Sequence, residues 1–218
     1  MTKTDADVLI IGAGPSGAMA GALLRKHGLR VLVLEKERFP RFSIGESLLA
    51  QSIGLLEEAG MLRAVVEAGF QFKNGAAFSR NGRRSEFDFR DKSCEGWSCT
   101  YQVQRAAFDK VLADEAAKAG VEIRYGHEIT AVDVSGGAPR LSVKGPEEKT
   151  YEVRGRFLLD ASGFGRILQR LLGLETPSGF PTRRAIFTHV EDRIPTGSFD
   201  RNKILVTVHP EHVDVWYW

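Results

Sequence analysis

The 218-residue sequence has little of several features that mark particular classes of protein. Lys and Arg number 30 against 28 Asp and Glu, whereas nucleic-acid-binding proteins usually carry a clear basic excess. No apolar run approaches the roughly 18 residues needed to cross a bilayer. The start of the chain includes Asp5 and Asp7, where a secretory signal would carry positive charge. We therefore predict a cytoplasmic protein that binds neither nucleic acid nor a membrane.

Cysteine is scarce as well. Cys94 and Cys99 are too few for a disulfide framework or a structural zinc site. Their spacing occurs in some redox-active pairs, but we expect two ordinary reduced thiols. His209 and His212 are separated by Pro210, which interrupts any helix that would align the two imidazoles. The sequence therefore predicts no metal site.

A glycine-rich turn between a predicted strand and a predicted helix is the strongest motif. Residues 8–11 form a short apolar run typical of a buried parallel strand, and residues 18–27 read as a helix. Gly12 permits the tight turn, Gly14 lets a pyrophosphate approach the backbone, and Gly17 lets helix and strand pack closely. The helix start then presents N–H groups to phosphates. The whole turn consists of Gly12, Ala13, Gly14, Pro15, Ser16 and Gly17.

A second predicted strand, 30–34, leads into Glu35, about 20 residues after the first glycine, where an acid binds ribose hydroxyls. We assign Glu35 and the adjacent Lys36 to a dinucleotide site. The motif alone leaves FAD and NAD(P) open, and its position near the start of the chain favours FAD.

Three later segments resemble the flavin-dependent halogenases and their relatives, the geranylgeranyl-reductase-like flavoproteins. They are residues 39–49 (FPRFSIGESLL), 102–109 (QVQRAAFD) and 157–163 (FLLDASG). The resemblance covers essentially the whole chain and implies FAD as cofactor. It places five further residues at the FAD site: Arg41, Ser47, Arg105, Asp160 and Gly163.

Each of these residues also has a physical interpretation that does not depend on the resemblance to the family. Arg41 and Arg105 suit phosphate or ribose contact, because a guanidinium offers several donors, but they also suit surface salt bridges. Ser47 reads equally as a helix cap. Asp160 opens a turn between a strand and an apolar helix, which fits a nucleotide-facing loop or an ordinary N-cap.

Residues 69–78 (GFQFKNGAAF) resemble the segment that carries the active-site lysine of halogenases, with Lys73 at the matching position. An ammonium enclosed by Phe70, Phe72 and Phe78 could hydrogen-bond hypohalous acid or form a haloamine. The alternative places Lys73 on the polar face of an alternating strand, with Phe70 and Phe72 facing inward.

Trp216 and Trp218 resemble the first half of the halogenase Trp-x-Trp-x-Ile-Pro motif, which implies that they separate substrate from flavin. Alternating aromatics also fit an edge or core strand.

The resemblance implies a halogenase-like enzyme. A flavin reductase would supply reduced FAD, which with oxygen and halide would generate hypohalous acid. Lys73 would pass it to an electron-rich aromatic substrate such as a phenol or pyrrole, including one held on a carrier protein. The alternatives are a related reductase, dehydrogenase or monooxygenase, and a non-catalytic FAD-binding fragment. Because the family's proteins are longer, we expect this chain to be the N-terminal part of a larger enzyme.

The predicted fold class is α/β. A Rossmann-like FAD-binding domain (1–75 and 101–175) is interleaved with part of a β-rich substrate domain (76–100 and 176–218). Strands are expected at 121–124, 128–134, 140–144 and 151–159, as a β-meander inserted before the last strand of the nucleotide sheet. The segments 76–100 and 182–218 are expected to be strand-rich and to form a second sheet over the flavin.

Overall fold

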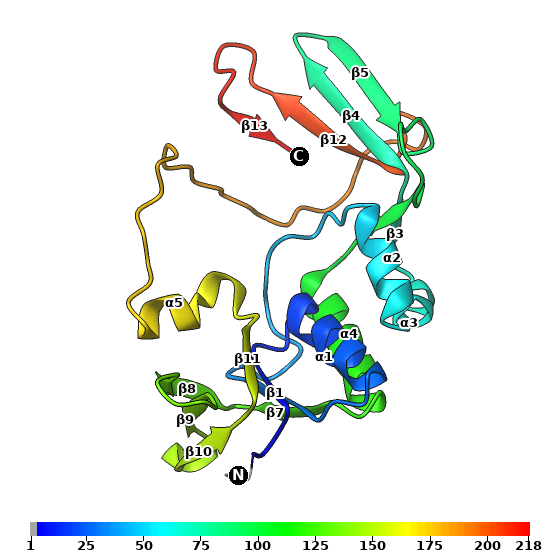
Figure 1. Ribbon diagram of the computed structural model, residues 1–218. Helices are drawn as coiled ribbons and strands as arrows, with labels where there is room; N and C mark the ends of the chain where they lie inside the picture. Colours follow the sequence, from blue (N-terminus) through cyan, green and yellow to red (C-terminus); the bar gives the residue numbers. More distant parts are fainter. Residues whose placement is uncertain (1–3) are drawn as a thin grey trace.

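A four-stranded parallel sheet lies at the base of the protein in the computed structural model, which describes residues 4–218 (Figure 1). Its strand order is β11-β1-β2-β7, and each neighbouring pair is parallel. The strands are β1 (Val8–Ile11), β2 (Val31–Glu35), β7 (Glu122–Tyr125) and β11 (Phe157–Asp160). β1 and β2 are buried along their whole length, which explains their uninterrupted apolar sequence.

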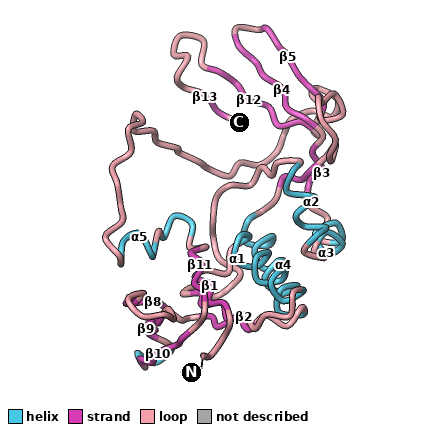
Figure 2. Tube along the Cα trace, viewed as in Figure 1, coloured by secondary structure: helices cyan, strands magenta, loops and turns pink. Residues whose placement is uncertain are grey.

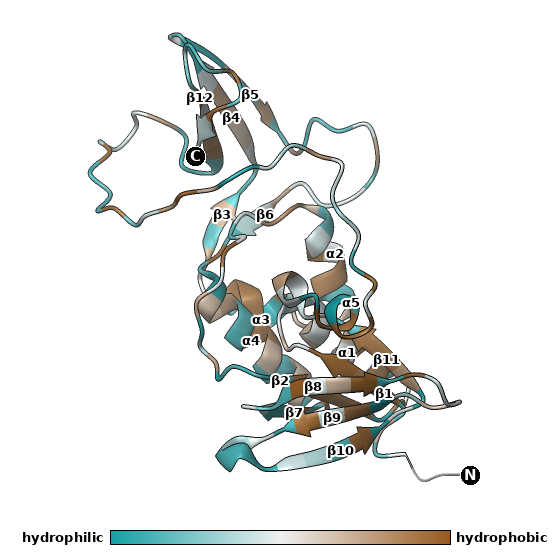
Figure 3. Cartoon of the chain, turned by 90° about the vertical axis from the view of Figure 1, so that its left-hand side faces the viewer, coloured by the Kyte–Doolittle hydropathy of each residue, from teal (hydrophilic) through white to brown (hydrophobic). Residues whose placement is uncertain are grey.

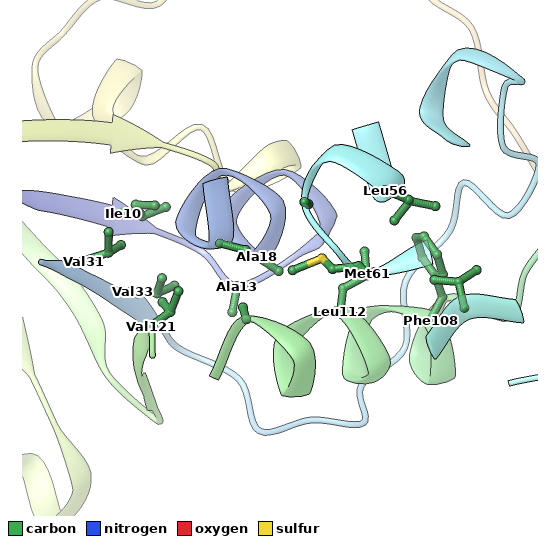
Figure 4. Close-up of a cluster of buried hydrophobic side chains, with 14 of the residues drawn as sticks. Ile10, Ala13, Ala18, Val31, Val33, Leu56, Met61, Phe108, Leu112 and Val121 are labelled. Carbon is green, nitrogen blue, oxygen red and sulfur yellow. The ribbon is translucent and has the colours of Figure 1, made fainter. Parts of the chain in front are cut away.

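Helices lie on one side of this sheet: the first and the last of them cover its face, and the two between them in sequence pack against that pair. They are α1 (Pro15–Lys26), α2 (Gln51–Glu58), α3 (Leu62–Glu67) and α4 (Arg105–Lys118). Figure 4 shows Ile10, Val31 and Val33 of the sheet on the side of Ala18 of α1, with Leu112 of α4 beside Met61 further along the same core. These side chains and others from α2 and α3 form one continuous core, which fixes the helix that follows the glycine turn.

A three-stranded antiparallel sheet covers the other face, in the order β10-β9-β8. Its strands are β8 (Glu128–Asp133), β9 (Arg140–Lys144) and β10 (Thr150–Arg154). Leu9 and Ile11 point to this side and pack with Leu141 and Val143, while Ile10 between them faces the helices. The apolar strands, brown in Figure 3, therefore carry two cores, one on each face.

The predicted meander was wrong in two places. Residues 122–125 form β7, which pairs with β2 in the parallel sheet rather than with the meander. The turn at Gly120, with φ of +90°, ends α4 and returns the chain to this sheet. The predicted strand 151–159 is divided at Gly155, where a Cβ would lie 2.7 Å from the Leu9 side chain. The meander thus has three strands, and β11 completes the nucleotide sheet.

A separate sheet lies at the other end of the molecule, in the order β13-β12-β4-β5 (Figure 1). It consists of β4 (Gly75–Arg80), β5 (Arg83–Asp88), β12 (Lys203–Val208) and β13 (Trp216–Tyr217). β12 pairs in parallel with β4, although the two are far apart in sequence. The short strands β3 (Gln71–Lys73) and β6 (Thr100–Gln102) pair antiparallel and lie between this sheet and the helices.

The expectation of dense strands over 182–218 and 76–100 was only partly right. Residues 174–202 and 89–99 contain no helix or strand and run as loops (Figure 2). The short helix α5 (Ile167–Leu171) precedes the longer of these loops. No helix within residues 4–218 is long and apolar enough to cross a membrane.

Candidate functional site

The glycine turn closes tightly against the loop that follows β11. Gly12 has φ of +95°, and a Cβ there would lie 2.7 Å from the carbonyl oxygen of Ala161. A Cβ on Gly17 would lie 1.9 Å from the Gly12 carbonyl oxygen. At Gly14, by contrast, the nearest atom to such a Cβ is a guanidinium nitrogen of Arg41, at 3.5 Å. Gly12 and Gly17 therefore hold the turn together, while Gly14 leaves room beside its backbone.

Helix α1 starts from this turn without a side-chain cap. Gly14 is its N-cap residue, Pro15 occupies the first helical position, and the first turn, which includes exposed Ser16, contains no acidic residue. The N–H groups and the positive end of the helix dipole are therefore available to an anion. This arrangement suits a phosphate group.

Glu35 ends β2 beside the turn, as predicted. It is only 5% exposed, and its carboxylate accepts hydrogen bonds from the backbone N–H groups of Ala13 and Glu37, both at 2.9 Å. Each carboxylate oxygen has a second lone pair that remains for a ribose hydroxyl. Lys36 is exposed and lines a polar pocket of about 360 Å³ between β2 and the meander.

Arg41 and Arg105 converge on one carboxylate, that of Asp109 on α4. Arg105 donates to it from Nε at 2.7 Å and from Nη2 at 3.1 Å, and Arg41 Nη1 lies 3.1 Å from the same group. The Asp109 side chain is 1% exposed, so these are not surface salt bridges. No role was predicted for Asp109 from the sequence, although its i,i+4 spacing from Arg105 was a signal.

Asp160 and Ser162 organise the turn before α5. Asp160 accepts hydrogen bonds from the backbone N–H groups of Ser162 and Leu168, both at 2.9 Å, and Ser162 Oγ accepts one from Ile167 at 3.0 Å. Asp160 is not the N-cap residue of α5, which is Arg166, although its carboxylate accepts the N–H of Leu168 in the first turn of that helix. Gly163 is exposed, with φ of +56°. The turn lies next to the glycine turn through the close approach of Ala161 to Gly12.

Lys73, at the end of β3, is buried without an acidic partner. It is 3% exposed, and none of the ion pairs within residues 4–218 involves it. Its ammonium donates a hydrogen bond of 2.7 Å to Ser47 Oγ and lies 5.7 Å from the centre of the Phe89 ring. Burial lowers the pKa of Lys73 from its usual value.

The expected enclosure of Lys73 by three phenylalanines was wrong. Phe70 packs edge-on against Phe108 in the helical core, and Phe72 and Phe78 are 41% and 39% exposed. The reading of Lys73 as the outward residue of an alternating strand was also wrong, because Phe72 is the exposed one. β3 has only three residues and pairs with β6, so the alternation of a longer half-buried strand does not apply.

Ser47 does not cap a helix. It forms an isolated bridge with Gln102, and α2 begins only at Gln51. Ser47 is itself exposed, so the hydroxyl that accepts the hydrogen bond from Lys73 belongs to a surface residue of the loop 36–50.

An aromatic groove of about 440 Å³ is connected to Lys73 through Phe89, although Lys73 does not itself line it. Three aromatic residues line it, and one of them, Phe89, is also the ring nearest the Lys73 ammonium. Arg90 holds the pKa of Asp88, at the groove's edge, at about 2, so this carboxylate is charged at neutral pH. The aromatic residues are Phe87, Phe89 and Trp97, and Cys94 is a further lining residue. The groove was not predicted from the sequence.

Trp216 and Trp218 lie away from the groove. Trp216 is on β13, at one edge of the second sheet, whereas Phe87 is on β5 at the opposite edge. Both tryptophans are exposed, at 43% and 69%. Residues 4–218 contain no cluster of three or more side chains that could hold a metal ion.

The parallel sheet, the glycine turn, the helix start and Glu35 define a dinucleotide-binding protein. The model of the FAD binding domain family matches residues 5–209. The chain therefore belongs to this family, in its flavin-dependent halogenase-like branch, and FAD is its cofactor. The geometry fits FAD, since a glycine without a side chain at position 14, an uncapped helix start and the Arg41 guanidinium meet where a pyrophosphate would lie.

Relatives agree with this assignment. The chain is 36% identical over 159 residues to a tryptophan 2-halogenase of Chondromyces crocatus, which covers 72% of this chain and 30% of the relative. It is 32% identical over 217 residues to a 1H-pyrrole-2-carbonyl-[peptidyl-carrier protein] brominase of Pseudoalteromonas luteoviolacea. This match covers 97% of this chain and 51% of the relative. The chain thus spans about half, or less, of the length of these relatives.

Solved structures are similar as well. A flavoprotein/dehydrogenase from Cytophaga hutchinsonii has a TM-score of 0.89 and 45% identity, covering 93% of this chain and 50% of that one. The flavin-dependent halogenase CmlS has a TM-score of 0.71 and 31% identity, and the match covers 79% of this chain and 32% of that one.

Proposed function

We propose that this chain is the FAD-binding part of an enzyme that halogenates electron-rich aromatic compounds. The observation that carries the proposal is Lys73, a buried ammonium without an acidic partner, beside an aromatic groove. Burying a charged lysine without a counter-ion costs stability, so such a residue at a cleft is more often kept for function.

On the cofactor side, the backbone of the glycine turn would hold the pyrophosphate, with Arg41 as its cationic partner, and Glu35 would bind the ribose. Arg105, Asp160 and Gly163 would shape the surrounding loops. When bound and reduced by a flavin reductase, FAD would supply the redox chemistry that converts oxygen and halide into hypohalous acid. We further propose the division into an FAD-binding domain (1–75 and 101–175) and part of a substrate domain (76–100 and 176–218).

Lys73 would bind the hypohalous acid or react with it. Its ammonium has three N–H groups, of which one is donated to Ser47 Oγ, so two remain for hypohalous acid. Alternatively the neutral amine reacts with HOX to give N–X and water, and the lowered pKa increases the fraction of neutral amine. In either case the aromatic carbon takes X⁺ and then loses its proton.

The groove would bind the aromatic substrate. Phe87 and Trp97 are 46% and 38% exposed, so the groove is open to the surface while Phe89 reaches the Lys73 ammonium. Rings stack well on such side chains. An open groove also admits a ring attached to a carrier protein, and relatives named as pyrrole-carrier halogenases support this substrate class.

The test is turnover of the protein in its full natural length. It is incubated with FAD, a flavin reductase, NADH, bromide and phenolic or pyrrolic acids, including carrier-bound pyrrole, and products are identified by mass. We expect brominated product from the wild type and from the control Lys110→Ala, a surface lysine on α4, and none from Lys73→Ala. Brominated product from Lys73→Ala would refute the role of Lys73.

A second candidate is a flavoprotein reductase, dehydrogenase or monooxygenase that does not use halide. The similarity to the Cytophaga hutchinsonii flavoprotein/dehydrogenase, over nearly the whole chain, favours keeping it. In the same assay this candidate predicts halide-independent turnover, with hydroxylated, reduced or dehydrogenated product.

A further inference from the structure

Asp109 is a buried carboxylate that no step proposed above uses. It lies in the second turn of α4, and the residue is fully buried. A buried carboxylate is stable when cations and hydrogen bonds compensate it. Its two oxygens accept hydrogen bonds from Arg105 and contact Arg41 Nη1. We define Asp109, Arg41 and Arg105 as the guanidinium cluster.

Arg41 connects this cluster to the glycine turn. Its Nη1 faces Asp109 at 3.1 Å, while its Nη2 lies 3.5 Å from the position of a Cβ on Gly14. Its guanidinium also lies over the Phe39 ring, 4.7 Å from the centre. One edge of the guanidinium is thus anchored and the other is directed at the space beside Gly14.

Arg105 fixes the loop that carries Arg41. The loop contains no helix, and its one β contact before α2 is the bridge at Ser47. Arg105 Nη1 donates hydrogen bonds to the carbonyl oxygens of Ile44 and Gly45, while its other nitrogens bind Asp109. Asp109 therefore orients both the arginine that faces the turn and the arginine that holds the loop in place.

We propose that Asp109 is a positioning residue for the pyrophosphate of FAD: it touches no cofactor atom itself but aims Arg41 at the phosphate beside Gly14. The inference rests on the proposed FAD contact of Arg41. Two guanidiniums and one carboxylate leave one net positive charge facing a doubly negative pyrophosphate.

Whether Asp109→Asn weakens or strengthens cofactor binding distinguishes a positioning role from a purely electrostatic one. Asp109→Asn keeps the shape and removes a negative charge near the phosphates, so a purely electrostatic role predicts tighter binding. Positioning predicts weaker binding, because Arg41 loses its charge-assisted anchor. The matched control is Asp114→Asn, which removes the same charge from an exposed i,i+4 pair with Lys110, about 7.5 Å beyond Asp109 along α4.

The experiment measures dissociation constants of FAD, ADP and adenosine for the wild type and the two variants, with circular dichroism to establish folding. We expect Asp109→Asn to weaken the binding of FAD and ADP about tenfold or more and to leave the binding of adenosine unchanged. Asp114→Asn should change none of the three dissociation constants. Unchanged or tighter ADP binding by Asp109→Asn would overturn the proposal.

Variants at Arg41 give an answer even if Asp109→Asn does not fold. Arg41→Lys keeps the charge but loses the geometry that Asp109 imposes, and Arg41→Gln loses both. We expect both variants to weaken ADP binding to a similar extent. If Arg41→Lys bound ADP as tightly as the wild type, the positioning role would be overturned. If the folded wild type bound neither FAD nor ADP, or Arg41→Gln left ADP binding unchanged, the proposed FAD contact itself would fail.

Discussion

Gly17→Ala is expected to destabilise the fold, whereas Gly14→Ala is not. The methyl group at position 17 would lie 1.9 Å from the Gly12 carbonyl oxygen, well below the 3.0 Å that real Cβ contacts respect. The backbone of the turn and α1 must therefore separate by about 1 Å. Overpacking of this kind costs about 3 kcal/mol, which for a domain of this size lowers Tm by about 6–12 °C.

Gly14→Ala provides the matched comparison. Gly14 has φ of −62°, and the nearest atom to its Cβ position is the Arg41 guanidinium at 3.5 Å, an ordinary contact. We expect its free energy of unfolding to change by less than about 1 kcal/mol, while FAD binding weakens because the methyl group occupies the approach of the pyrophosphate. Thermal unfolding and flavin fluorescence titration measure the two effects. A Tm for Gly17→Ala within about 2 °C of the wild type would refute the reasoning.

Three further predictions concern other parts of the structure. Glu35→Gln leaves one backbone N–H without an acceptor and should lower the free energy of unfolding by about 1–3 kcal/mol; urea denaturation checks this, and an unchanged midpoint would contradict it. Leu112→Ala, in the fully buried core, should cost about 2–5 kcal/mol in the same assay, and a loss below about 1 kcal/mol would show that the site is not packed as described. Lys73→Met should be more stable than the wild type at neutral pH. Since the folded pKa of Lys73 is lowered, the wild type gains stability as pH rises from that pKa towards the usual 10.5, so the Tm difference should shrink. A difference that stays constant between pH 7 and 10 would argue against a buried charge.

Local patterns predicted the nucleotide-binding unit well. The strand at 8–11, the glycine turn, the helix and the second strand ending at Glu35 are all confirmed, because each depends on neighbours close in sequence. The segment 121–124 was predicted as a strand but assigned to the wrong sheet. Strand pairing depends on long-range contacts, here between β2 and β7, and a single sequence does not reveal them.

The residues of the candidate site were predicted from the sequence better than the contacts between them. Lys73 was singled out, but its partners Ser47 and Phe89 come from segments 26 and 16 residues away. The bridge of Ser47 to β6, the partner strand of β3, brings the first, and a backbone hydrogen bond of Phe89 to Asn74 brings the second. Asp109 was missed because a charged residue in an amphipathic helix normally faces solvent. Its burial depends on Arg41, which arrives from a loop without regular structure.

Titration of the folded chain with FAD tests the central claim, that the glycine turn and its surrounding residues bind this cofactor. We predict one FAD per chain, displaced by ADP, with binding weakened in Gly14→Ala at an unchanged Tm. A chain that is folded by circular dichroism yet binds neither FAD nor ADP, or binds them equally well with a methyl group at position 14, would contradict the account.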